Sequence, residues 1–390
     1  MNVCHAFIWF SVKFTGGTTE FIAKICQSQT KAGIKTGVYA STSHFDRELA
    51  SSLPETDFKL VSSYLDRAGF SIMPKLPAMA DKELDSFDVV HMHVFRTFQN
   101  LVLAYYCRKK KIPYVLDIHG SAPYGTRKRW LKKVFDRFWG KRMLRDAAFL
   151  VAESQAGIDE YRDILPDLPD SKMKIIPPSF DIQEFQNLPE KGQFREKLGI
   201  KAEEKLIIFI GRLTPIKGLE FLIEAFKVLA GKRQDCRLAI IGDDSGTGYF
   251  DLLKAKVNEF GLSQTVLFTG FLGGREKLAA LVDADLLAQT SKREQGPRVP
   301  FEAVLCGTSV IVTGHTGSGE AVRNFDAGET ITYGNVDEFV FSVETILNDF
   351  NGARKRVELA RGKISKEMSM EAIVRQYTDL YLAAGNLQNR

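Results

Sequence analysis

The stretch "KLIIFIGRLTPIKGLEFLIEAF" (residues 205–226) carries the pattern that decides the fold. It opens with a nearly continuous apolar run, which predicts a strand buried on both faces. Glycine and proline then interrupt the run, and apolar residues at helical spacing follow Gly218. A buried strand, a short loop and an amphipathic helix make half of a βαβ unit. The stretch therefore predicts a parallel α/β sheet.

The same alternation runs through both halves of the chain and predicts two Rossmann-like domains in tandem. In the N-terminal half the expected strands are "VCHAFIWF" (3–10), "TGVYA" (36–40), "FDVVHMH" (87–93) and "IPYVLDIHG" (112–120). In the C-terminal half, after residue 205, they are "CRLAIIGDD" (236–244), "TVLFTGF" (265–271), "DLLAQTS" (285–291) and "SVIVTG" (309–314).

A proline-containing stretch without clear periodicity, residues 172–192, predicts a linker between the two domains. We expect an N-terminal domain over 1–183 and a C-terminal domain over 184–365. Residues 366–390 contain an amphipathic helix that could pack back on the N-terminal domain. Ligands of open parallel sheets bind outside the carboxyl ends of the strands, so two such sheets facing one another predict an interdomain cleft.

Composition describes an ordinary soluble protein and leaves few special classes open. The chain has 390 residues, 44% hydrophobic and 26% charged, with a net charge of +5 that is too small to indicate nucleic acid. Five scattered cysteines without CxxC spacing predict a reducing compartment. No signal peptide and no apolar run of about 20 residues is found, so we expect a cytoplasmic protein.

The loop "GRLTPIKG" (211–218) places Arg212 and Lys217 between a strand and a helix. Two cations at this position suit an anion such as a diphosphate, although solvated surface charges would give the same pattern. The chain lacks a Walker loop, and "GDDSGTG" (242–248) does not have the order of a dinucleotide fingerprint. A dehydrogenase is therefore disfavoured.

A second loop, "REQGPRVPFE" (293–302), lies between an expected strand and an expected helix. Backbone N–H groups at such a helix start attract phosphate, whereas the flanking acids Glu294 and Glu302 would repel it. A carboxylate instead accepts O–H bonds from vicinal hydroxyls of ribose or a sugar. The two loops together predict a pocket for a nucleoside diphosphate sugar.

These motifs resemble those of glycosyltransferase family 4, a family of retaining enzymes with the GT-B fold of two facing Rossmann-like domains. The similar segments are "GRLTPIKGLEFLIEAF" (211–226) and "REQGPRVPFEAVLCGTSVIVTGHTGSGEAV" (293–322), with the family's Glu, seven residues, Glu spacing. The N-terminal segment "GGTTEFIAKICQSQTKAGIKTGVYAS" (16–41) and "IIPPSFDIQEF" (175–185) extend the resemblance over most of the chain.

The resemblance implies that the domain over 1–183 binds the acceptor and the domain over 184–365 binds the nucleotide sugar. It also implies roles for particular residues. Arg212 and Lys217 would hold the diphosphate and stabilise the leaving group. Glu302 would accept the ribose hydroxyls, Glu294 would contact the transferred sugar, and His119 would lie by the sugar and acceptor. Further donor contacts are implied for Gly16, Gly17, Gly296, Pro297 and Arg298.

The sequence departs from the family's pattern at two places, where the implied residue roles are less secure. The family often has Gly-Phe-Gly after the first Glu, where this chain has Gln295, Gly296 and Pro297, so sugar preference is open. "TGSGE" replaces the usual "GGxPE", which makes Glu320 a weaker candidate.

We expect no metal and no cofactor beyond the donor, with UDP or GDP as its nucleotide. "DAD" (283–285) resembles the metal motif of another glycosyltransferase fold but enters an expected strand, so we interpret it as structural. His91, His93 and His119 could form a zinc triad if their strand ends converged. Such histidines are more often polar residues at strand ends.

The stretch "RKRWLKKVFDRFWGKRMLR" (127–145) has nine cations and one acid, with aromatic residues at helical spacing. Such a helix could lie on an anionic membrane surface, or its aromatic stripe could pack on the sheet and leave only cations in solvent. The first alternative favours a lipid-linked acceptor and an enzyme peripheral to the inner face of the membrane.

The resemblance, together with the basic stretch, thus implies a metal-independent retaining hexosyltransferase acting on a glycan or lipid-linked acceptor in cell-surface polysaccharide or glycolipid assembly. A nucleotide-sugar epimerase, a soluble glucan or disaccharide synthase and a non-catalytic nucleotide-sugar binding protein remain alternatives. Neither the sugar nor the base can be read from the residues.

Overall fold

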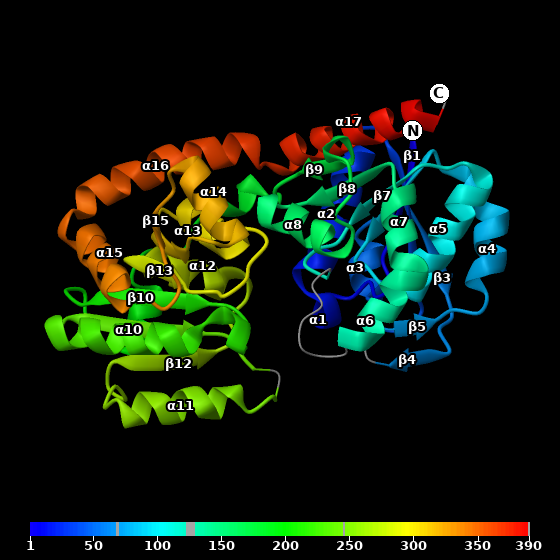
Figure 1. Cartoon of the computed structure of the whole chain (residues 1–390). Helices are drawn as coiled ribbons and strands as arrows, with labels where there is room; N and C mark the ends of the chain where they lie inside the picture. The colour runs from blue at the N-terminus through cyan, green and yellow to red at the C-terminus, as the bar shows by residue number, and fades with distance from the viewer. Residues whose placement is uncertain (68–69, 122–128, 245, 389–390) are drawn as a thin grey trace. The chain divides into compact units, whose positions relative to one another are not determined.

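The computed structural model describes residues 1–67, 70–121, 129–244 and 246–388. It divides into two compact units, Met1–Ser179 with Met370–Arg390, and Phe180–Ser369 (Figure 1). Each unit holds a parallel sheet between layers of helices, which confirms the expected pair of Rossmann-like domains. The division falls after Ser179 instead of residue 183, because Phe180 is already buried in the core of the second unit.

The sheet of unit 1 has the strand order β3-β2-β1-β6-β7-β8-β9, and every neighbouring pair is parallel. Met173–Ile175, which the sequence assigned to a linker, forms its edge strand β9. A separate antiparallel pair joins β4 (Leu65–Arg67) to β5 (Phe70–Ile72). The remaining strands are β1 (Asn2–Ala6), β2 (Lys35–Ser41), β3 (Thr56–Val61), β6 (Val89–His93), β7 (Tyr114–Asp117) and β8 (Phe149–Ala152).

Two cores cover the two faces of this sheet, because alternate strand residues point to opposite faces. One core includes Val3, Val89 and Val115 and packs against α2 (Gly17–Lys31) and α17 (Met370–Gln388). The other core includes Cys4, Val90 and Leu116. It packs against α4 (Leu76–Glu83), α5 (Phe98–Lys110), α7 (Lys141–Asp146) and α8 (Gln155–Ile164). Short helices complete the unit: α1 (Val12–Thr15), α3 (Arg47–Ser51), α6 (Arg129–Phe135) and a π-helical turn (Asp136–Gly140).

Unit 2 repeats the plan with the strand order β12-β11-β10-β13-β14-β15, again parallel throughout. Strand order reverses between β10 and β13, and ligands of such sheets bind at this switch point. The strands are β10 (Lys205–Ile210), β11 (Cys236–Ile241), β12 (Val266–Gly270), β13 (Leu286–Gln289), β14 (Ser309–Thr313) and β15 (Glu329–Ile331).

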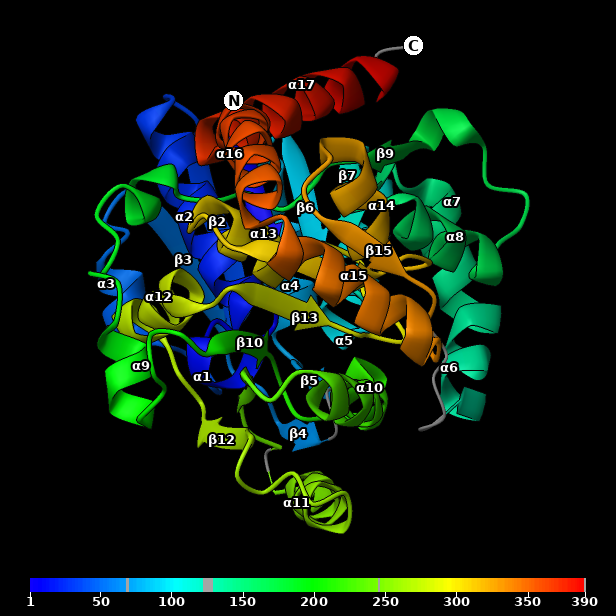
Figure 2. The same ribbon diagram turned by 90° about the vertical axis from the view of Figure 1, so that its left-hand side faces the viewer.

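Helices cover both faces of the second sheet. On one face α10 (Leu219–Lys232) and α15 (Val336–Asn348) lie side by side, with α11 (Tyr249–Glu259) beyond α10 (Figure 2). The other face carries α9 (Gln193–Leu198), α12 (Gly274–Asp283), α13 (Arg298–Leu305), α14 (Gly317–Phe325) and α16 (Phe350–Glu367).

The aspartates of "DAD" bind the protein itself. Asp283 accepts the backbone N–H groups of Phe194 and Arg195 at 2.7 and 3.0 Å and so holds the start of α9. Asp285 pairs with the Arg195 guanidinium at 2.6 Å. Both carboxylates therefore join α9 to the start of β13.

The last two helices of the chain belong to different units. α16 ends at Glu367 in unit 2, and α17 begins at Met370 and packs on unit 1, where it contacts α2. Residues 389–390 lie outside the described residues. The unit boundary thus falls between residues 369 and 370 instead of at 365.

Candidate functional site

The loops after β10 and β13 lie together at the switch point of the unit 2 sheet. Backbone N–H of Lys292 donates to the Ile216 carbonyl at 2.8 Å, and the Thr290 hydroxyl donates to the Gly218 carbonyl at 3.2 Å. Gly218 has φ +68°, and a Cβ there would lie 2.1 Å from the Thr290 carbonyl oxygen. Only glycine permits this approach, so the sequence itself fixes the two loops against one another.

Lys217 and Glu294 are joined across these loops. The Lys217 ammonium donates to Glu294 Oε2, and the Ser291 hydroxyl reaches the same oxygen at 3.4 Å. Arg212, on the same loop as Lys217, is exposed. One end of the sheet therefore gathers two cations and an acid that the sequence had placed in separate motifs.

The loop 294–297 is held at the start of α13. The Gly317 N–H donates to the Glu294 carbonyl at 2.8 Å, and the Ser318 hydroxyl donates to the Gly296 carbonyl at 2.8 Å. Pro297 caps α13, whose first residue is Arg298. The N–H groups of this first helical turn, together with the two nearby cations, make the end of β13 attractive to an anion.

Glu302 lies inside α13 and is buried. Its Oε1 accepts from the Lys277 ammonium at 2.9 Å, while its Oε2 has no hydrogen-bond partner among the described residues. A buried carboxylate oxygen without a partner is costly unless a ligand supplies a donor. Glu302 is thus suited to accept a hydroxyl. Glu320 lies in the first turn of α14.

Gly16 and Gly17 lie in unit 1, where Gly16 is the N-cap of α2 and Gly17 its first residue. Gly16 has φ +55°, and a Cβ there would meet no atom within 4 Å. Glycine is therefore favoured by the backbone angle and not by crowding inside the unit. Phe21, one turn further along α2, packs on the ring of His119 with centroids 5.6 Å apart.

His119 follows β7, and its side chain is turned toward the sheet. Its Nε2 lies 2.9 Å from His93 Nδ1, and its Nδ1 lies 3.4 Å from Asp117 Oδ1. The His119 backbone, at φ +41°, donates its N–H to the same Asp117 oxygen at 3.2 Å. Both ring nitrogens therefore face protein groups.

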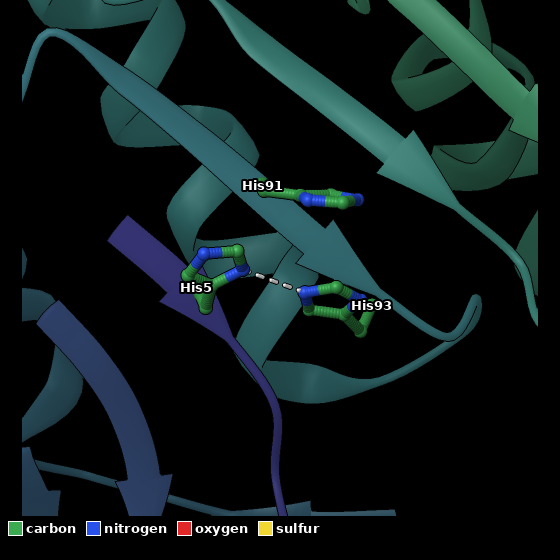
Figure 3. A group of neighbouring side chains, drawn as sticks. All are labelled: His5, His91 and His93. Atoms are coloured by element: carbon green, nitrogen blue, oxygen red, sulfur yellow. Dashed lines mark hydrogen bonds between the residues drawn. The ribbon is translucent and has the colours of Figure 1, made fainter. Parts of the chain in front are cut away.

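The contacts of His119 continue into a buried row of polar side chains. His93 Nε2 lies 3.0 Å from His5 Nδ1 (Figure 3). At the other side of the ring, His5 Nε2 lies 2.9 Å from Gln29 Oε1. The register explains the row: His5 is paired with His91, and His93 with Asp117, so period-2 alternation points all four toward α2 and α17.

Helix α17 completes this cluster from the far end of the chain. The Tyr377 hydroxyl donates to Asp117 Oδ2 at 2.9 Å, and the Tyr381 hydroxyl lies 2.7 Å from His91 Nδ1. Burial raises the pKa of Asp117 to about 7 and lowers the pKa of His5 to about 4. Burial also holds the pKa of His91 and of His93 well below the usual value, so both rings are neutral.

By distance alone, His5, His91 and His93 could hold a metal ion, since one nitrogen of each lies within 4.8 Å of the others. The set differs from the expected triad, because His5 takes the place of His119. The rings of His91 and His93 lie against one another with centroids 4.0 Å apart. Two imidazoles on one tetrahedral zinc would have centroids about 5 Å apart. This arrangement suits a hydrogen-bonded stack better than a metal centre.

Family models match both units of the chain. The model described as Glycosyl transferases group 1 matches residues 190–363, and that of Glycosyltransferase Family 4 matches residues 15–184. The chain belongs to the GT-B glycosyltransferases of this group 1, family 4 type. Arg212, Lys217, Glu294 and Glu302 fall in the first match, and Gly16, Gly17 and His119 in the second.

Among relatives of this glycosyltransferase is an uncharacterized glycosyltransferase of Methanocaldococcus jannaschii, 28% identical over 79% of this chain and 78% of its own length. The D-inositol 3-phosphate glycosyltransferase of Mycobacterium ulcerans is 29% identical over 47% of this chain and 39% of its own. The mannosylfructose-phosphate synthase of Agrobacterium fabrum is 31% identical over 38% and 34%. The chain thus matches less than half of the last two enzymes.

Solved structures with the same fold include HepE of Anabaena in complex with UDP and glucose, with a TM-score of 0.78 and 20% identity. That match covers 97% of this glycosyltransferase and 98% of HepE. WaaG, a glycosyltransferase involved in lipopolysaccharide biosynthesis, matches with a TM-score of 0.67 and 16% identity over 97% and 99%. These likenesses establish the GT-B fold.

Sequence reasoning missed several residues of this glycosyltransferase's candidate site. Lys277 had no motif to mark it, because its contact with Glu302 depends on how α12 lies beside α13. His5 carried one signal, since it lies inside the apolar strand "VCHAF", where a polar residue is unusual. The other missed residues are Gln29, Asp117, Tyr377 and Tyr381.

Proposed function

We propose that this glycosyltransferase moves a sugar, with retention of configuration, from a nucleoside diphosphate sugar to a glycan or lipid-linked acceptor. The observation that carries the proposal is the ion pair between Lys217 and Glu294 at the switch point of the unit 2 sheet. Arg212 lies on the same loop as Lys217, and Glu302 lies in α13, the helix that follows the loop of Glu294. The complexes of HepE with UDP and with UDP-glucose support a donor of this class.

Different charged residues bind different parts of such a donor. Lys217 and Arg212 bind the diphosphate and stabilise the negative charge that grows on it as the sugar leaves. Glu302 accepts ribose hydroxyls through its unpartnered Oε2. Glu294, on the loop before α13, accepts hydroxyls of the sugar. Because Lys217 pairs with Glu294, diphosphate and sugar are held by one connected group of charges.

Retention is proposed to follow from attack on the same face that the diphosphate leaves, with the diphosphate helping to remove the acceptor proton. The two cations of the β10 loop supply charge that a divalent ion supplies in other transferases, so we propose catalysis without a metal. Asp283 and Asp285, the aspartates of "DAD", are engaged with α9.

The acceptor side of the proposal rests on the surface of α6 and α7. Residues 127 and 128 of the basic stretch lie outside the described residues. In the rest, its single acid Asp136 is buried and pairs with Arg96 at 2.6 Å, and a Cβ on Gly140 would lie 2.4 Å from Asp136 Oδ1. Asp136 thus anchors the π-helical turn to the unit and directs the opposite side of the helix outward.

The aromatic residues on that outer side are exposed. Trp130 is 68%, Phe138 62% and Trp139 46% exposed, while Phe135 packs on the core. A groove of about 560 Å³ next to them is lined by residues that include Tyr105 and Met143. The alternative, in which the aromatic stripe packs on the sheet and leaves only cations in solvent, holds for Phe135 but not for Trp130, Phe138 and Trp139.

Exposed aromatic rings among cations are what an anionic membrane surface attracts. In the described parts of the chain no helix has the length and apolarity to cross a membrane. We propose that the enzyme associates peripherally with the inner face of a membrane through α6, the π-helical turn and α7. A lipid-linked acceptor in cell-surface polysaccharide or glycolipid assembly fits this surface.

Thermal-shift screening against UDP-, GDP- and ADP-sugars tests the donor directly. We expect one nucleotide class to raise the melting temperature, and the matching sugar then to be transferred with its anomeric configuration kept, followed by NMR. Binding without transfer or hydrolysis would indicate a non-catalytic binding protein, and interconversion of the free donor would indicate an epimerase. Stabilisation by a nicotinamide dinucleotide in place of every nucleotide sugar would contradict the proposal.

A further inference from the structure

Within unit 1, the hydrogen bonds of the histidine row determine where each proton lies. Gln29 Oε1 is a carbonyl oxygen and can only accept, so His5 Nε2 must carry a proton. Because His5 is neutral, its Nδ1 has no proton and accepts from His93 Nε2, 3.0 Å away. His93 is neutral as well, so its Nδ1 accepts from His119 Nε2 at 2.9 Å.

We propose that Gln29, His5 and His93 form a proton-ordered chain that fixes the tautomer of His119, with the proton on Nε2 and directed inward. His5 and His93 are then positioning residues, since they act on His119 and not on a substrate. The inference deepens the proposed function, because it assigns a state to a residue placed at the acceptor side.

In this row of hydrogen bonds His119 Nε2 carries the proton, so His119 Nδ1 is the nitrogen that can accept one. That atom faces Asp117 Oδ1 at 3.4 Å, and Asp117 is also fixed by the His119 N–H and by Tyr377. Burial raises the pKa of Asp117 to about 7, so this carboxyl titrates near neutral pH. A proton held by Asp117 can therefore pass to His119 Nδ1 without any change in the order of the buried histidines.

Other titratable groups around the row do not change charge near neutral pH. Burial raises the pKa of Tyr377 and Tyr381 on α17, of Tyr161 on α8 and of Cys26 on α2. His91, which lies against His93, stays neutral. Glu153 contributes through its charge to raising the pKa of Tyr377. Glu371 and Asp379 of α17 are exposed.

Nitrogen NMR of the full chain with ¹⁵N-labelled histidine tests the order without any assay of activity. The chain has six histidines, and the exposed His44 and His315 serve as references. We expect His5, His93 and His119 to show the Nε2–H tautomer at pH 7, with His5 and His93 remaining neutral below pH 6. An Nδ1–H tautomer at His93 or His119 would overturn the proposal. So would stoichiometric metal in the purified protein that shifts the nitrogens of His5, His91 and His93.

A matched pair of variants shows whether His5 acts through its hydrogen bond or only by filling space. His5→Leu removes the acceptor of the His93 proton, so His119 should become a mixture of tautomers, whereas His5→Gln keeps an acceptor and should restore the Nε2–H form. Melting curves of both variants check that unit 1 still folds. A His119 tautomer unchanged in folded His5→Leu would contradict the chain.

Kinetics form a separate arm that depends on the proposed function. In His5→Leu we expect kcat to fall roughly 2- to 10-fold, the worth of one hydrogen bond, with donor KM unchanged and recovery in His5→Gln. An unchanged kcat, or a loss that His5→Gln does not repair, would count against a positioning role. If wild type transfers no sugar, the proposed function fails while the NMR result stands by itself.

Discussion

The Lys217 ammonium and the Glu294 carboxylate come from loops 77 positions apart in the chain and meet as an ion pair. Each neutralises the other in a partly buried setting, so neither charge is left unpaired between β10 and β13. A diphosphate beside Lys217 and a sugar beside Glu294 would therefore enter a site whose charges are already held in place. This relationship determines what substitutions there should do.

Lys217→Ala should lower kcat/KM for transfer about 100- to 1,000-fold, because it removes a charge that stabilises the leaving diphosphate. The melting temperature should change by only a few degrees, since Lys217 is partly exposed. Lys232→Ala, an exposed change on α10, is the matched control and should leave transfer intact. Near-normal turnover of Lys217→Ala would refute the placement of the diphosphate.

Glu302→Ala should abolish transfer and remove the enzyme's preference for a ribose over a deoxyribose nucleotide. Wild type should bind UDP or GDP, whichever stabilises it, at least about tenfold more tightly than the 2′-deoxy form, because a hydrogen bond to a carboxylate is lost. Calorimetry of both nucleotides with both proteins measures this difference. A preference that survives in Glu302→Ala would place the ribose elsewhere.

Lys277→Ala provides the companion to that experiment. It leaves Glu302 in place but removes the ammonium that holds its Oε1 at 2.9 Å. Nucleotide affinity should fall less than in Glu302→Ala, and the preference for ribose should persist.

Neutralising Lys132, Lys133, Arg137, Lys141 and Arg142 should release the protein from anionic vesicles. Each cation near the surface contributes about 1 kcal/mol of attraction at low salt. A control variant loses five exposed lysines of unit 2: Lys201, Lys232, Lys355, Lys363 and Lys366. It should partition like wild type in a sedimentation assay. Equal partitioning of the first variant and wild type would remove the membrane from the proposal.

Relative to wild type, the Asp117→Asn variant should gain stability as pH rises. Folding raises the pKa of Asp117 from 3.8 to about 7, so between these values the folded state holds a proton that the unfolded chain has lost. Stability contributed by this proton is present below about pH 4 and is lost as pH rises through 7. The melting temperature of the variant relative to wild type should increase between pH 5 and pH 8. Asp379→Asn, exposed on α17, should show no such trend.

The His5→Gln variant should show the opposite pH dependence: relative to wild type it should gain stability as pH falls. Burial lowers the pKa of His5 from 6.5 to about 4, so the unfolded chain binds the additional proton between these values. Wild type therefore loses stability as pH falls from 6.5 toward 4. The variant should lose less than wild type over this range, and parallel melting curves would show that His5 is not the group responsible.

The sequence could predict those parts of the protein whose signal is local. Apolar strand runs and helical spacing lie within short stretches, so the α/β class could be predicted. The same stretches marked Arg212, Lys217, Glu294 and Glu302 as candidates, and their roles stay predictions. Strand β9 was missed because three residues beside two prolines carry no periodic pattern. It forms because it can pair with β8.

The histidine row could not be predicted, because its members come from distant parts of the chain. Period-2 alternation puts His91 and His93 on one face of β6, but His5 joins them only because β1 pairs with β6 across 80 residues and more. Tyr377 and Tyr381 come from a helix that follows the whole of unit 2. Such contacts depend on sheet order and helix docking, which a single sequence does not specify.

The position of α17 has a consequence for synthesis of the chain. Residues 180–369, which form unit 2, are synthesised before α17. Unit 2 can therefore fold before unit 1 is complete, although unit 1 begins the chain. Until α17 docks, Asp117 lacks Tyr377 and His91 lacks Tyr381, and the apolar face beside α2 stays open to solvent. We therefore expect nascent unit 1 to be more prone to aggregation than nascent unit 2 until α17 is in place.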